Sequence, residues 1–542
     1  MNLARNGALA LRLVNGARDE EQIAAWLAQP ALLEWWQPDE PTQPHDDDVV
    51  RCIIDEDDEA LGYAQLYPVA GRWHEYGLRA DEVQSVWALD LFIGDPSRWG
   101  SGIGTDSLSL IVDHVLVDRA ARRIVVDPRA ANTRALRSYE KVGFRRAGSL
   151  PEHEVVDGEA WDCVLMSLDA LDHPVGLTAH LAGIDSVNPS LVRGAAGESE
   201  VAHSVAAWAA QRGMEVSLDE VSPGRWNVVA VRRGSGGGRS LLLNAHLDTV
   251  GPAATPIRLG DGRLEGRGVL DTKGGLAAAL LAAASFANGE LAGDVIVAGV
   301  ADEECGSIGT EALVEGRTAD AAVVLEPTDL HVVHRHRGFA TVTATITGRA
   351  SHTSRPDRGV NAVHAAAAAI TAVAELDRQW EAAADDPVVR PATLVSIVRH
   401  DGEMFTVPAR CEIVAEIRTT AEGHDDEIAA VARTIGAAVA AADAAASVEL
   451  TPHHGRLGLG VDAVDPFVAA VAAAVGAATH REPVLAAAPY WTDAALHSEA
   501  GTPSVVLGPV GQGLHEDLEW VTTRSLHQCR DALTHLARHW CT

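Results

Sequence analysis

Four short apolar runs in the second half of the chain each lead to a side chain that can bind a metal ion. Runs of this kind, rich in β-branched residues, are typical of buried parallel strands. Ligands of open α/β sheets gather beyond the carboxyl ends of such strands. The runs begin at Ser240, Asp294, Ala321 and Ser504, and they lead to His246 and Asp248, to Glu303 and Glu304, to Glu326, and to His515. With Asp271, from the segment Gly268-Val-Leu-Asp-Thr-Lys-Gly-Gly275, they predict a metal site at this edge.

The spacing within two of these motifs indicates a division of roles. In His246-Leu-Asp248 the two side chains of a strand point the same way, so Asp248 can orient the imidazole of a metal-bound His246. Glu303 and Glu304 lie on one turn, where one can hold metal and the other can act on water as a general base. Alone, such residues are usually a satisfied polar histidine and a solvated acidic pair. Their joint occurrence at strand ends favours a metal site.

A glycine-rich turn in the first third of the chain is a second candidate site. Gly100-Ser-Gly102-Ile103-Gly104 lies between a strand expected over 86–93 and a helix expected over 105–117. Unhindered backbone N–H groups beside a helix N-terminus suit a pyrophosphate. A plain tight turn is an equally good interpretation of the glycines alone.

The elements that must position these residues fall into two modules. The first runs over residues 1–171, with a further strand over 123–127 and a helix over 132–142 that ends at Gly143. A short polar joint over 169–176 leads to the second module. There, the runs over 336–346, 394–398 and 409–417 alternate like half-exposed antiparallel strands. We therefore expect a metal-binding α/β layer over 177–334 and 451–542, interrupted by a smaller α+β lid over 335–450.

Composition limits the possible partners and compartment. The chain has 542 residues, a formal net charge of −33 and 47% hydrophobic residues. Its acidic balance argues against nucleic acid or an anionic membrane as a partner. Six scattered cysteines suggest neither a disulfide framework nor a thiolate zinc site. The first residues lack the apolar segment of a secretory leader and no stretch reaches the length of a membrane span, so we expect a cytoplasmic protein.

The motifs of the second module run from Ile184-Asp-Ser-Val-Asn-Pro189 through His246-Leu-Asp-Thr-Val to Gly508-Pro and His515-Glu516. By these motifs, residues 177–542 closely resemble the acetylornithine deacetylase, succinyl-diaminopimelate desuccinylase and carboxypeptidase G family of dinuclear metallohydrolases. The resemblance implies two divalent metal ions, most often zinc and sometimes cobalt or manganese. It assigns one ion to His246 and Glu326, the other to Glu304 and His515, and a bridging role to Asp271, with Glu303 as general base.

The same resemblance extends to the lid. His352, within Gly348-Arg-Ala-Ser-His-Thr, matches a histidine that stabilises the oxyanion, commonly from a neighbouring subunit, which implies a homodimer. Arg418 matches an arginine that binds a substrate carboxylate, a task suited to a guanidinium. A surface histidine and an ordinary salt bridge are the alternatives. The family often carries Asn ahead of the lid Val-Pro pair, whereas Phe405 and Thr406 precede Val407 and Pro408 here.

Three further motifs accompany the glycine turn: Trp35-Trp36, Leu89-Asp-Leu-Phe-Ile-Gly94 and Asn132-Thr-Arg-Ala-Leu-Arg-Ser-Tyr139. By these motifs, residues 10–168 resemble the GNAT acetyltransferase superfamily, and within it the aminoglycoside 6′-N-acetyltransferases and related siderophore acyltransferases. This resemblance implies that the turn at 100–105 binds acetyl-CoA, that Asn132 contacts the pantetheine arm and that Tyr139 protonates the leaving thiolate. Asp90 would serve as base or anchor for an amine. The alternatives are a packed helix aromatic for Tyr139 and a strand-end cap for Asp90. Trp99 stands where many members have Arg or Gln, and acidic stretches at 46–48 and 55–59 could attract a polycationic acceptor.

Together these features predict a bifunctional enzyme. One module would transfer an acetyl group from acetyl-CoA to a small-molecule amine, and the other would cleave an N-acyl amino compound. We expect the two to add and remove an acetyl protecting group within one pathway. Two alternatives stay open at this point: the hydrolase is a dipeptidase or carboxypeptidase, or the first module is a non-catalytic binding scaffold.

Overall fold

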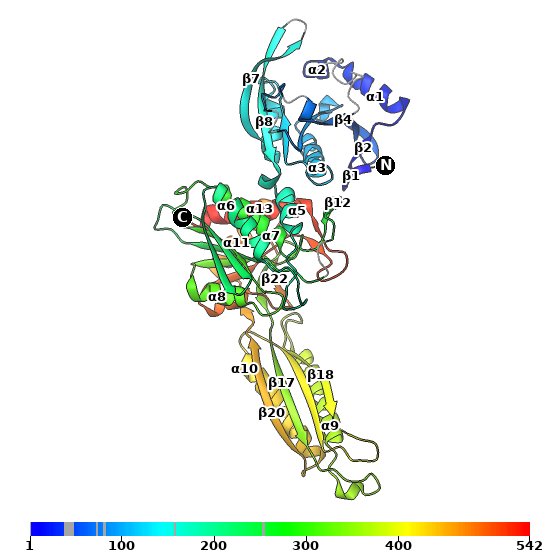
Figure 1. Ribbon diagram of the computed structural model, residues 1–542, viewed down its shortest axis with the longest axis vertical. Helices are drawn as coiled ribbons and strands as arrows, with labels where there is room; N and C mark the ends of the chain where they lie inside the picture. The colour runs from blue at the N-terminus through cyan, green and yellow to red at the C-terminus, as the bar shows by residue number, and fades with distance from the viewer. Residues whose placement is uncertain are drawn as a thin grey trace.

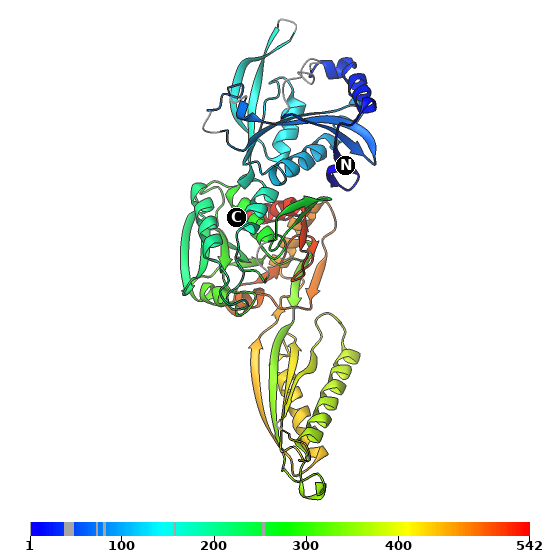
Figure 2. The same ribbon diagram turned by 45° about the vertical axis from the view of Figure 1, so that its right-hand side comes forward.

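A computed structural model describes residues 2–36, 48–71, 74–79, 83–156, 159–251, 255–400 and 402–542. Three units follow one another along the long axis of the molecule, an N-terminal unit, a central unit and a lid (Figures 1 and 2). Each is built around its own main β-sheet. Among the described residues, no helix combines the length and apolarity needed to cross a bilayer.

The N-terminal unit is an eight-stranded sheet with strand order β1-β2-β3-β4-β5-β6-β8-β7. Its only parallel pair among the described strands is β5 with β6. The strand after residue 85 ends as predicted at Ile93, and α3 follows the glycine turn. The elements are β1 (Asn2–Asn6), β2 (Leu9–Leu13), α1 (Ala17–Leu27), α2 (Pro30–Leu33), β3 (Val50–Glu56), β4 (Glu59–Pro68), β5 (Val86–Ile93), α3 (Ile103–Val117), β6 (Arg123–Val126), α4 (Thr133–Val142), β7 (Arg145–Val156) and β8 (Glu159–Asp169).

The central unit is a nine-stranded sheet in which the four predicted strands are direct neighbours, in the order β23-β15-β11-β14 and all parallel. Their residues are apolar on both faces because helices cover both. Leu241 and Leu243 of β11 pack in one core with α7, and Leu242 packs in another with Leu313 of α8. The prediction of a buried parallel layer is therefore confirmed.

The remaining elements of the central unit are as follows. Before the lid come α5 (Pro174–Ala182), α6 (Ser199–Gln211), β9 (Glu215–Ser222), β10 (Arg225–Arg232), β11 (Leu241–His246), β12 (Arg258–Gly260), β13 (Arg263–Glu265), α7 (Lys273–Ala284), β14 (Val295–Val300), α8 (Ile308–Gly316), β15 (Ala321–Val324) and β16 (Val332–His336). After the lid come β21 (Leu459–Gly460), α11 (Pro466–Thr479), β22 (Leu485–Ala488), α12 (Ala494–Glu499), β23 (Ser504–Val506), β24 (Gly511–Gln512), β25 (Trp520–Thr522) and α13 (Thr523–Trp540). Strands β12, β13, β25 and β24 form a small separate sheet.

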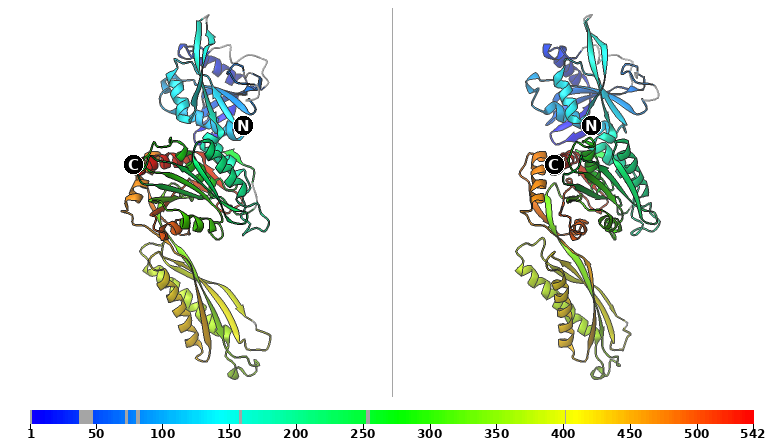
Figure 3. Two further views of the ribbon diagram at one scale, coloured as in Figure 1. Left: turned by 60° about the vertical axis from the view of Figure 1, so that its left-hand side comes forward. Right: turned by 90° about the vertical axis from the view of Figure 1, so that its left-hand side faces the viewer.

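The lid is a four-stranded antiparallel sheet in the order β18-β19-β17-β20, with two helices on one face (Figure 3). Alternate residues of β17 are buried, and α9 buries Ala362, Ala365, Ala366, Ala369 and Val373 at helical spacing, so strands and helices share one core. The elements are β17 (Gly338–Thr347), α9 (Ala362–Ala383), β18 (Ala392–His400), β19 (Arg410–Thr419), α10 (His424–Ala442) and β20 (Ser447–Arg456).

Two element bounds differ from the predicted divisions. Strand β20 continues to Arg456, beyond the predicted lid boundary at residue 450, because it pairs with β17 along almost its whole length. The predicted polar joint over 169–176 includes the start of α5, which begins at Pro174. A Cβ at Gly176 would lie 2.2 Å from the backbone oxygen of Ala170, so the chain turns tightly here. The division into domains otherwise stays a prediction.

Candidate active sites

Two groups of metal-ligating side chains meet at the carboxyl edge of the central sheet. His246, Asp271 and Glu326 form one group, and Asp271, Glu304 and His515 form the other, with the ligand atoms of each group within 4.8 Å of one another. The Nε2 atom of His246 lies 2.9 Å from Oδ1 of Asp271 and 3.8 Å from Oε1 of Glu326. The Nε2 atom of His515 lies 3.5 Å from Oδ2 of Asp271 and 3.0 Å from Oε2 of Glu304. Asp271 therefore offers one oxygen to each group.

The charges in this cluster suit two cations. Burial, followed by the charge of Glu326, raises the pKa of Glu303 well above its usual range, and burial likewise raises the pKa of Glu326. Burial alone would also raise the pKa of Asp271, but hydrogen bonds with His246 and His515 outweigh it and hold that pKa low. Buried carboxylates are costly unless they are paired or coordinate metal. The donor set therefore fits two divalent ions that share Asp271.

Asp248 contacts this cluster differently from the prediction. The Nδ1 atom of His246 lies 2.8 Å from the backbone oxygen of Asp248 and 3.6 Å from its carboxylate. The carboxylate instead accepts hydrogen bonds from the backbone N–H groups of Glu303 and Glu304, both at 3.2 Å, and from Asn188 at 2.7 Å. Asp248 therefore holds the histidine with its backbone and the two glutamates with its side chain.

A buried ionic network also contacts the turn that carries Glu303 and Glu304, and it was not predicted from the sequence. Arg225 donates to Glu198 at 2.7 Å and to Asp302, the residue before Glu303, at 2.9 Å. Asp302 also accepts from Asn188 at 3.0 Å. Arg225 and Glu198 lie outside any recognisable motif. The only sequence signal in this network is Asn188, within the quoted Ile184–Pro189 segment.

A cavity of about 270 Å³ opens beside the turn, between the central unit and the lid. Glu303 and Glu304 line it from the central unit, and Arg418 lines it from β19. Within the part of the chain that the structure describes, Arg418 forms no ion pair. Arg456 and Trp491 also line the cavity, and neither was predicted. Arg456 is engaged, since its guanidinium pairs with Glu311 at 2.5 Å.

The structure does not bring His352 to the metal-ligating cluster of its own chain. His352 is exposed, and its Nδ1 atom contacts Ser354 Oγ at 2.9 Å. The segment that carries it, between β17 and α9, lies at the end of the lid away from the central unit (Figure 1). The predicted role of His352 therefore requires a second chain.

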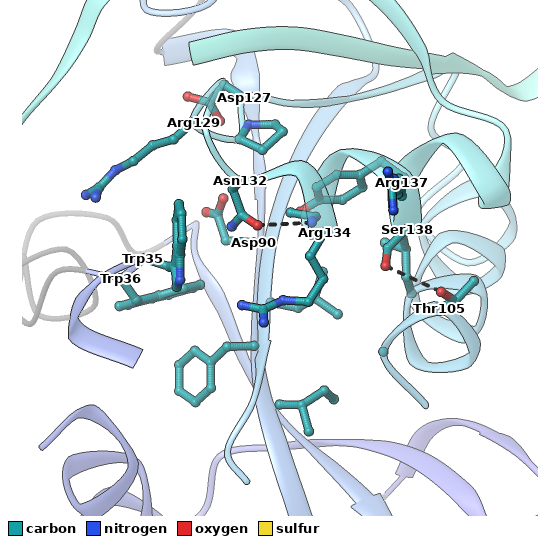
Figure 4. A pocket seen from close by; sticks show the side chains of 18 of the residues that line it. Trp35, Trp36, Asp90, Thr105, Asp127, Arg129, Asn132, Arg134, Arg137 and Ser138 are labelled. Atoms are coloured by element: carbon teal, nitrogen blue, oxygen red, sulfur yellow. Dashed lines mark hydrogen bonds between the residues drawn. The ribbon is translucent and has the colours of Figure 1, made fainter. Parts of the chain in front are cut away.

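The N-terminal unit contains a larger cavity of about 980 Å³, which several of the predicted residues line (Figure 4). Gly100, Gly102, Ile103 and Gly104 lie on one side of it, at the N-terminus of α3. Gly100 and Gly102 have φ values of 81° and 98°, and a Cβ at either position would meet nothing within 4 Å. The glycines are therefore needed for backbone conformation, which turns the chain into α3 and leaves its N-terminus accessible to an anion.

Asp90 and Tyr139 line the same cavity from β5 and α4. Asp90 accepts hydrogen bonds from Gln65 at 2.9 Å and from Tyr67 at 3.0 Å. Tyr139 is 8% exposed, and its burial raises the pKa of its hydroxyl, so it stays protonated at neutral pH. Asn132 caps α4, since its Oδ1 accepts from the N–H of Ala135 at 3.1 Å, and it too lines the cavity.

Cationic side chains around this cavity add to the predicted set. Arg134 and Arg137 of α4 line the cavity (Figure 4). The guanidinium of Arg134 lies 4.0 Å from the ring centre of Trp99, so this tryptophan contacts a cation at the cavity wall. The only sequence signal for the arginines was their place within the segment that carries the resemblance.

The described carboxylates of the acidic stretches are partly paired and partly exposed: Asp48, Asp57, Asp58 and Glu59 are exposed, and Asp58 pairs with Arg5. Asp46 and Asp47 lie outside the described residues. In the second stretch, Asp55 pairs with Arg12 at 2.7 Å and Glu56 pairs with Arg98. These two carboxylates therefore serve contacts within the N-terminal unit.

Comparison with known families gives the class of each part. A family model for the peptidase family M20/M25/M40 matches residues 242–539, which is more than half of the chain, so the chain belongs to this family. A model of the GNAT acetyltransferase domain matches residues 15–151. The chain therefore combines an acetyltransferase domain with a metallohydrolase domain, as predicted.

Individual relatives agree with both parts. Acetylornithine deacetylase of Myxococcus xanthus is 29% identical over 336 residues, which are 60% of this chain and 86% of that protein. Aminoglycoside N(6′)-acetyltransferase type 1 of Klebsiella pneumoniae is 28% identical over 162 residues, 27% of this chain and 78% of that protein. The crystal structure of aminopeptidase PepT from Bacillus cereus has a TM-score of 0.58 at 21% identity, covering 69% of this chain and 99% of that one, and it shows the shared fold.

Proposed function

We propose that the chain installs an acetyl group on a small-molecule amine and removes an acyl group from an N-acyl amino compound of the same pathway. The observation that carries the hydrolytic half is the pair of ligand groups that meet at Asp271 beside a cavity lined by Glu303 and Arg418. The acetylornithine deacetylase and aminoglycoside acetyltransferase relatives support acyl–amine bonds as the common chemistry.

In the hydrolase, His246, Glu326, Glu304 and His515 would hold two divalent ions, and both ions would share Asp271. The ions, zinc by donor type and otherwise cobalt or manganese, would supply Lewis acidity to water and to the amide carbonyl. Glu303 would act as the general base. Two observations support this role: it is adjacent to the proposed ligand Glu304, and it lines the cavity without belonging to either ligand group. It would take a proton from water and pass it to the leaving amine.

Arg418 would bind a carboxylate of the substrate. It lines the cavity from β19 of the lid, whereas Glu303 lines it from the central unit, and among the described residues Arg418 forms no ion pair. A guanidinium held in this way fixes the orientation of a substrate by paired hydrogen bonds. The preferred substrate would therefore carry a carboxylate on one side of the scissile amide, as N-acyl amino acids do.

In the acetyltransferase, the amides at the start of α3 would bind the pyrophosphate of acetyl-CoA, and Asn132 would contact the pantetheine arm. Tyr139 would protonate the leaving thiolate, a role that its protonated, buried hydroxyl supports. Asp90 would accept a proton from the attacking amine or anchor it, since its carboxylate is fixed by Gln65 and Tyr67 at the cavity wall.

A homodimer is part of this proposal. His352 could stabilise an oxyanion only at the hydrolytic site of a second copy, because its own segment lies at the far end of the lid. A His352→Ala chain and a Glu303→Gln chain should each be nearly inactive alone. Mixing them should restore part of the deacylase activity if the lid acts on the second copy.

The test is incubation with acetyl-CoA and a panel of amines and their N-acetyl forms, followed by mass spectrometry in both directions. We expect chelator and Glu303→Gln to abolish deacylation and to leave acetyl transfer intact. Preference for unacetylated dipeptides would replace the deacylase assignment by a dipeptidase. Absence of any amine shared by the two activities would refute the common pathway, and failure to bind acetyl-CoA would leave the N-terminal unit a scaffold.

A further inference from the structure

Three metal-ligating side chains meet where the N-terminal unit contacts the central unit. Asp113 comes from α3, His173 precedes α5, and His527 comes from α13, and these helices lie side by side at the junction (Figure 1). One ligand atom of each lies within 4.8 Å of the other two. The Nδ1 atom of His173 is 3.9 Å from Oδ1 of Asp113, and the centres of the two imidazole rings are 4.7 Å apart.

Asp113 and His173 are buried and His527 is half-buried, and several of their polar atoms lack a hydrogen-bond partner among the described residues. The carboxylate of Asp113 also has a hydrogen bond with Thr523. Asp113 is 5% exposed and His173 is 1% exposed. Within the described part of the chain, no hydrogen-bond partner meets either ring nitrogen of His173, Nε2 of His527 or Oδ1 of Asp113. Buried polar atoms in folded proteins nearly always have a partner. Three such groups that converge on one point therefore indicate a shared ligand.

We propose that Asp113, His173 and His527 bind one divalent transition-metal ion, best matched by zinc, that fastens the N-terminal unit to the central unit. Imidazole nitrogen and carboxylate oxygen are zinc donors, and two histidines with one carboxylate form a common ligand set. The nearby cation Arg530 is itself paired with Asp531 at 2.7 Å. The site shares no residue with the hydrolytic cluster around Asp271.

The position of the site gives the ion a structural role. Asp113 and His527 are more than four hundred residues apart in sequence, and one ion would cross-link their helices with the start of α5. Apolar contacts at the same junction include a small cluster in which Val117 of α3 packs against residues that include Val175 of α5. A metal cross-link would therefore add a fixed point between two units that each have their own core.

The number of bound metal ions tests the proposal. The full chain is loaded with excess zinc, passed through a desalting column and analysed for zinc by plasma mass spectrometry. We expect three equivalents in the wild-type chain and two in His173→Ala and in Asp113→Asn, with deacylase activity retained because the hydrolytic cluster is unchanged. The matched control is His454→Ala, which removes an exposed histidine from another His-Asp group and should keep three equivalents.

A second measurement separates metal loss from misfolding. Circular dichroism and affinity for acetyl-CoA should be unchanged in Asp113→Asn, which has nearly the same shape as the wild-type residue. The chain with Glu303→Gln keeps all three sites, so chelator should lower the melting temperature of its N-terminal unit. The decrease should be smaller in the chain that also carries Asp113→Asn. Two equivalents in the wild-type chain, or equal zinc content in wild type and both junction variants, would overturn the proposal.

Discussion

The carboxylate of Asp248 accepts a hydrogen bond from the backbone N–H of Glu304 at 3.2 Å. Its second oxygen accepts from the N–H of Glu303, also at 3.2 Å, while its backbone oxygen contacts the ring of His246. One aspartate therefore connects the end of β11 with the turn that follows β14, and it sets the positions of the predicted ligands His246 and Glu304 and of the predicted base Glu303.

Replacing Asp248 with Ala should lower both metal affinity and deacylation, because the turn that carries Glu303 and Glu304 loses two hydrogen bonds. Loss of a group that orients metal ligands typically costs about 10- to 100-fold. Zinc titration and steady-state kinetics measure the two effects. The exposed Asp219→Ala serves as control and should change neither quantity. Unchanged zinc affinity in Asp248→Ala would contradict the role inferred here.

Arg418→Ala should raise KM for substrates that carry a carboxylate and change kcat little, since the lost contact orients the ground state as well as the transition state. Hydrogen bonds to charged groups contribute about 1.5–3 kcal/mol, equivalent to a rise in KM of about 10- to 150-fold. The methyl ester of the same substrate is the matched control. For the ester, wild type and variant should have similar KM values, and an equal loss for both substrates would exclude carboxylate recognition.

Tyr139→Phe should slow acetyl transfer and leave acetyl-CoA binding intact. The phenylalanine keeps the edge-to-face packing on Phe144, whose ring centre lies 5.4 Å away, so only the hydroxyl is lost. A positioned proton donor contributes about 10²–10⁴-fold to a rate. Single-turnover transfer and calorimetric titration with acetyl-CoA separate the two effects. Transfer at the wild-type rate would assign Tyr139 to packing alone.

Buried strands could be predicted from the sequence, whereas the networks of hydrogen-bonded side chains could not. The strand that leads to His246 was predictable because a run buried on both faces leaves an apolar pattern that no exposed strand has. The buried ion pair of Arg225 and Glu198 could not be predicted, because the sequence does not distinguish a charged residue that is solvated from one that is paired. Likewise, Asp248 was predicted to orient His246 through its carboxylate, since spacing along a strand gives direction but does not show that two backbone N–H groups lie within reach.

The remaining differences between prediction and structure concern residues whose positions depend on contacts between distant parts of the chain. The predicted ligand His515 was found because it follows a buried strand. Arg456, at the end of β20, and Trp491 were missed, because their place at the cavity depends on how the lid meets the central sheet. The segment 169–176 was predicted as a polar joint because few helical signals precede Pro174, where α5 begins. Tertiary packing decided these positions, and local patterns did not.

Stability should fall as the pH drops from about 6.5 toward 4, partly because of His336. Burial lowers the pKa of this histidine to about 4. The unfolded chain, with a histidine pKa near 6.5, then binds more protons than the folded chain between these two values, so acid favours unfolding. Thermal midpoints of wild type and His336→Gln, measured across this range, should fall less steeply for the variant. The exposed His454→Gln should retain the wild-type slope, and parallel curves for all three would refute the assignment.

Arg225→Met should destabilise the central unit and loosen the turn that carries Glu303. The side chain of Arg225 is 9% exposed and that of its partner Glu198 is fully buried, so the variant leaves Glu198 and Asp302 without their cation. Removing one partner from a buried ion pair costs about 3–5 kcal/mol. Arg233→Met is the matched control, because Arg233 pairs with Glu215 and Asp294 while remaining 49% exposed, and such surface pairs contribute only about 0–1 kcal/mol. Hydrogen exchange provides a local measurement: the amides of residues 302–304 should exchange faster in Arg225→Met, whereas exchange at wild-type rates would show that Asp248 alone holds the turn.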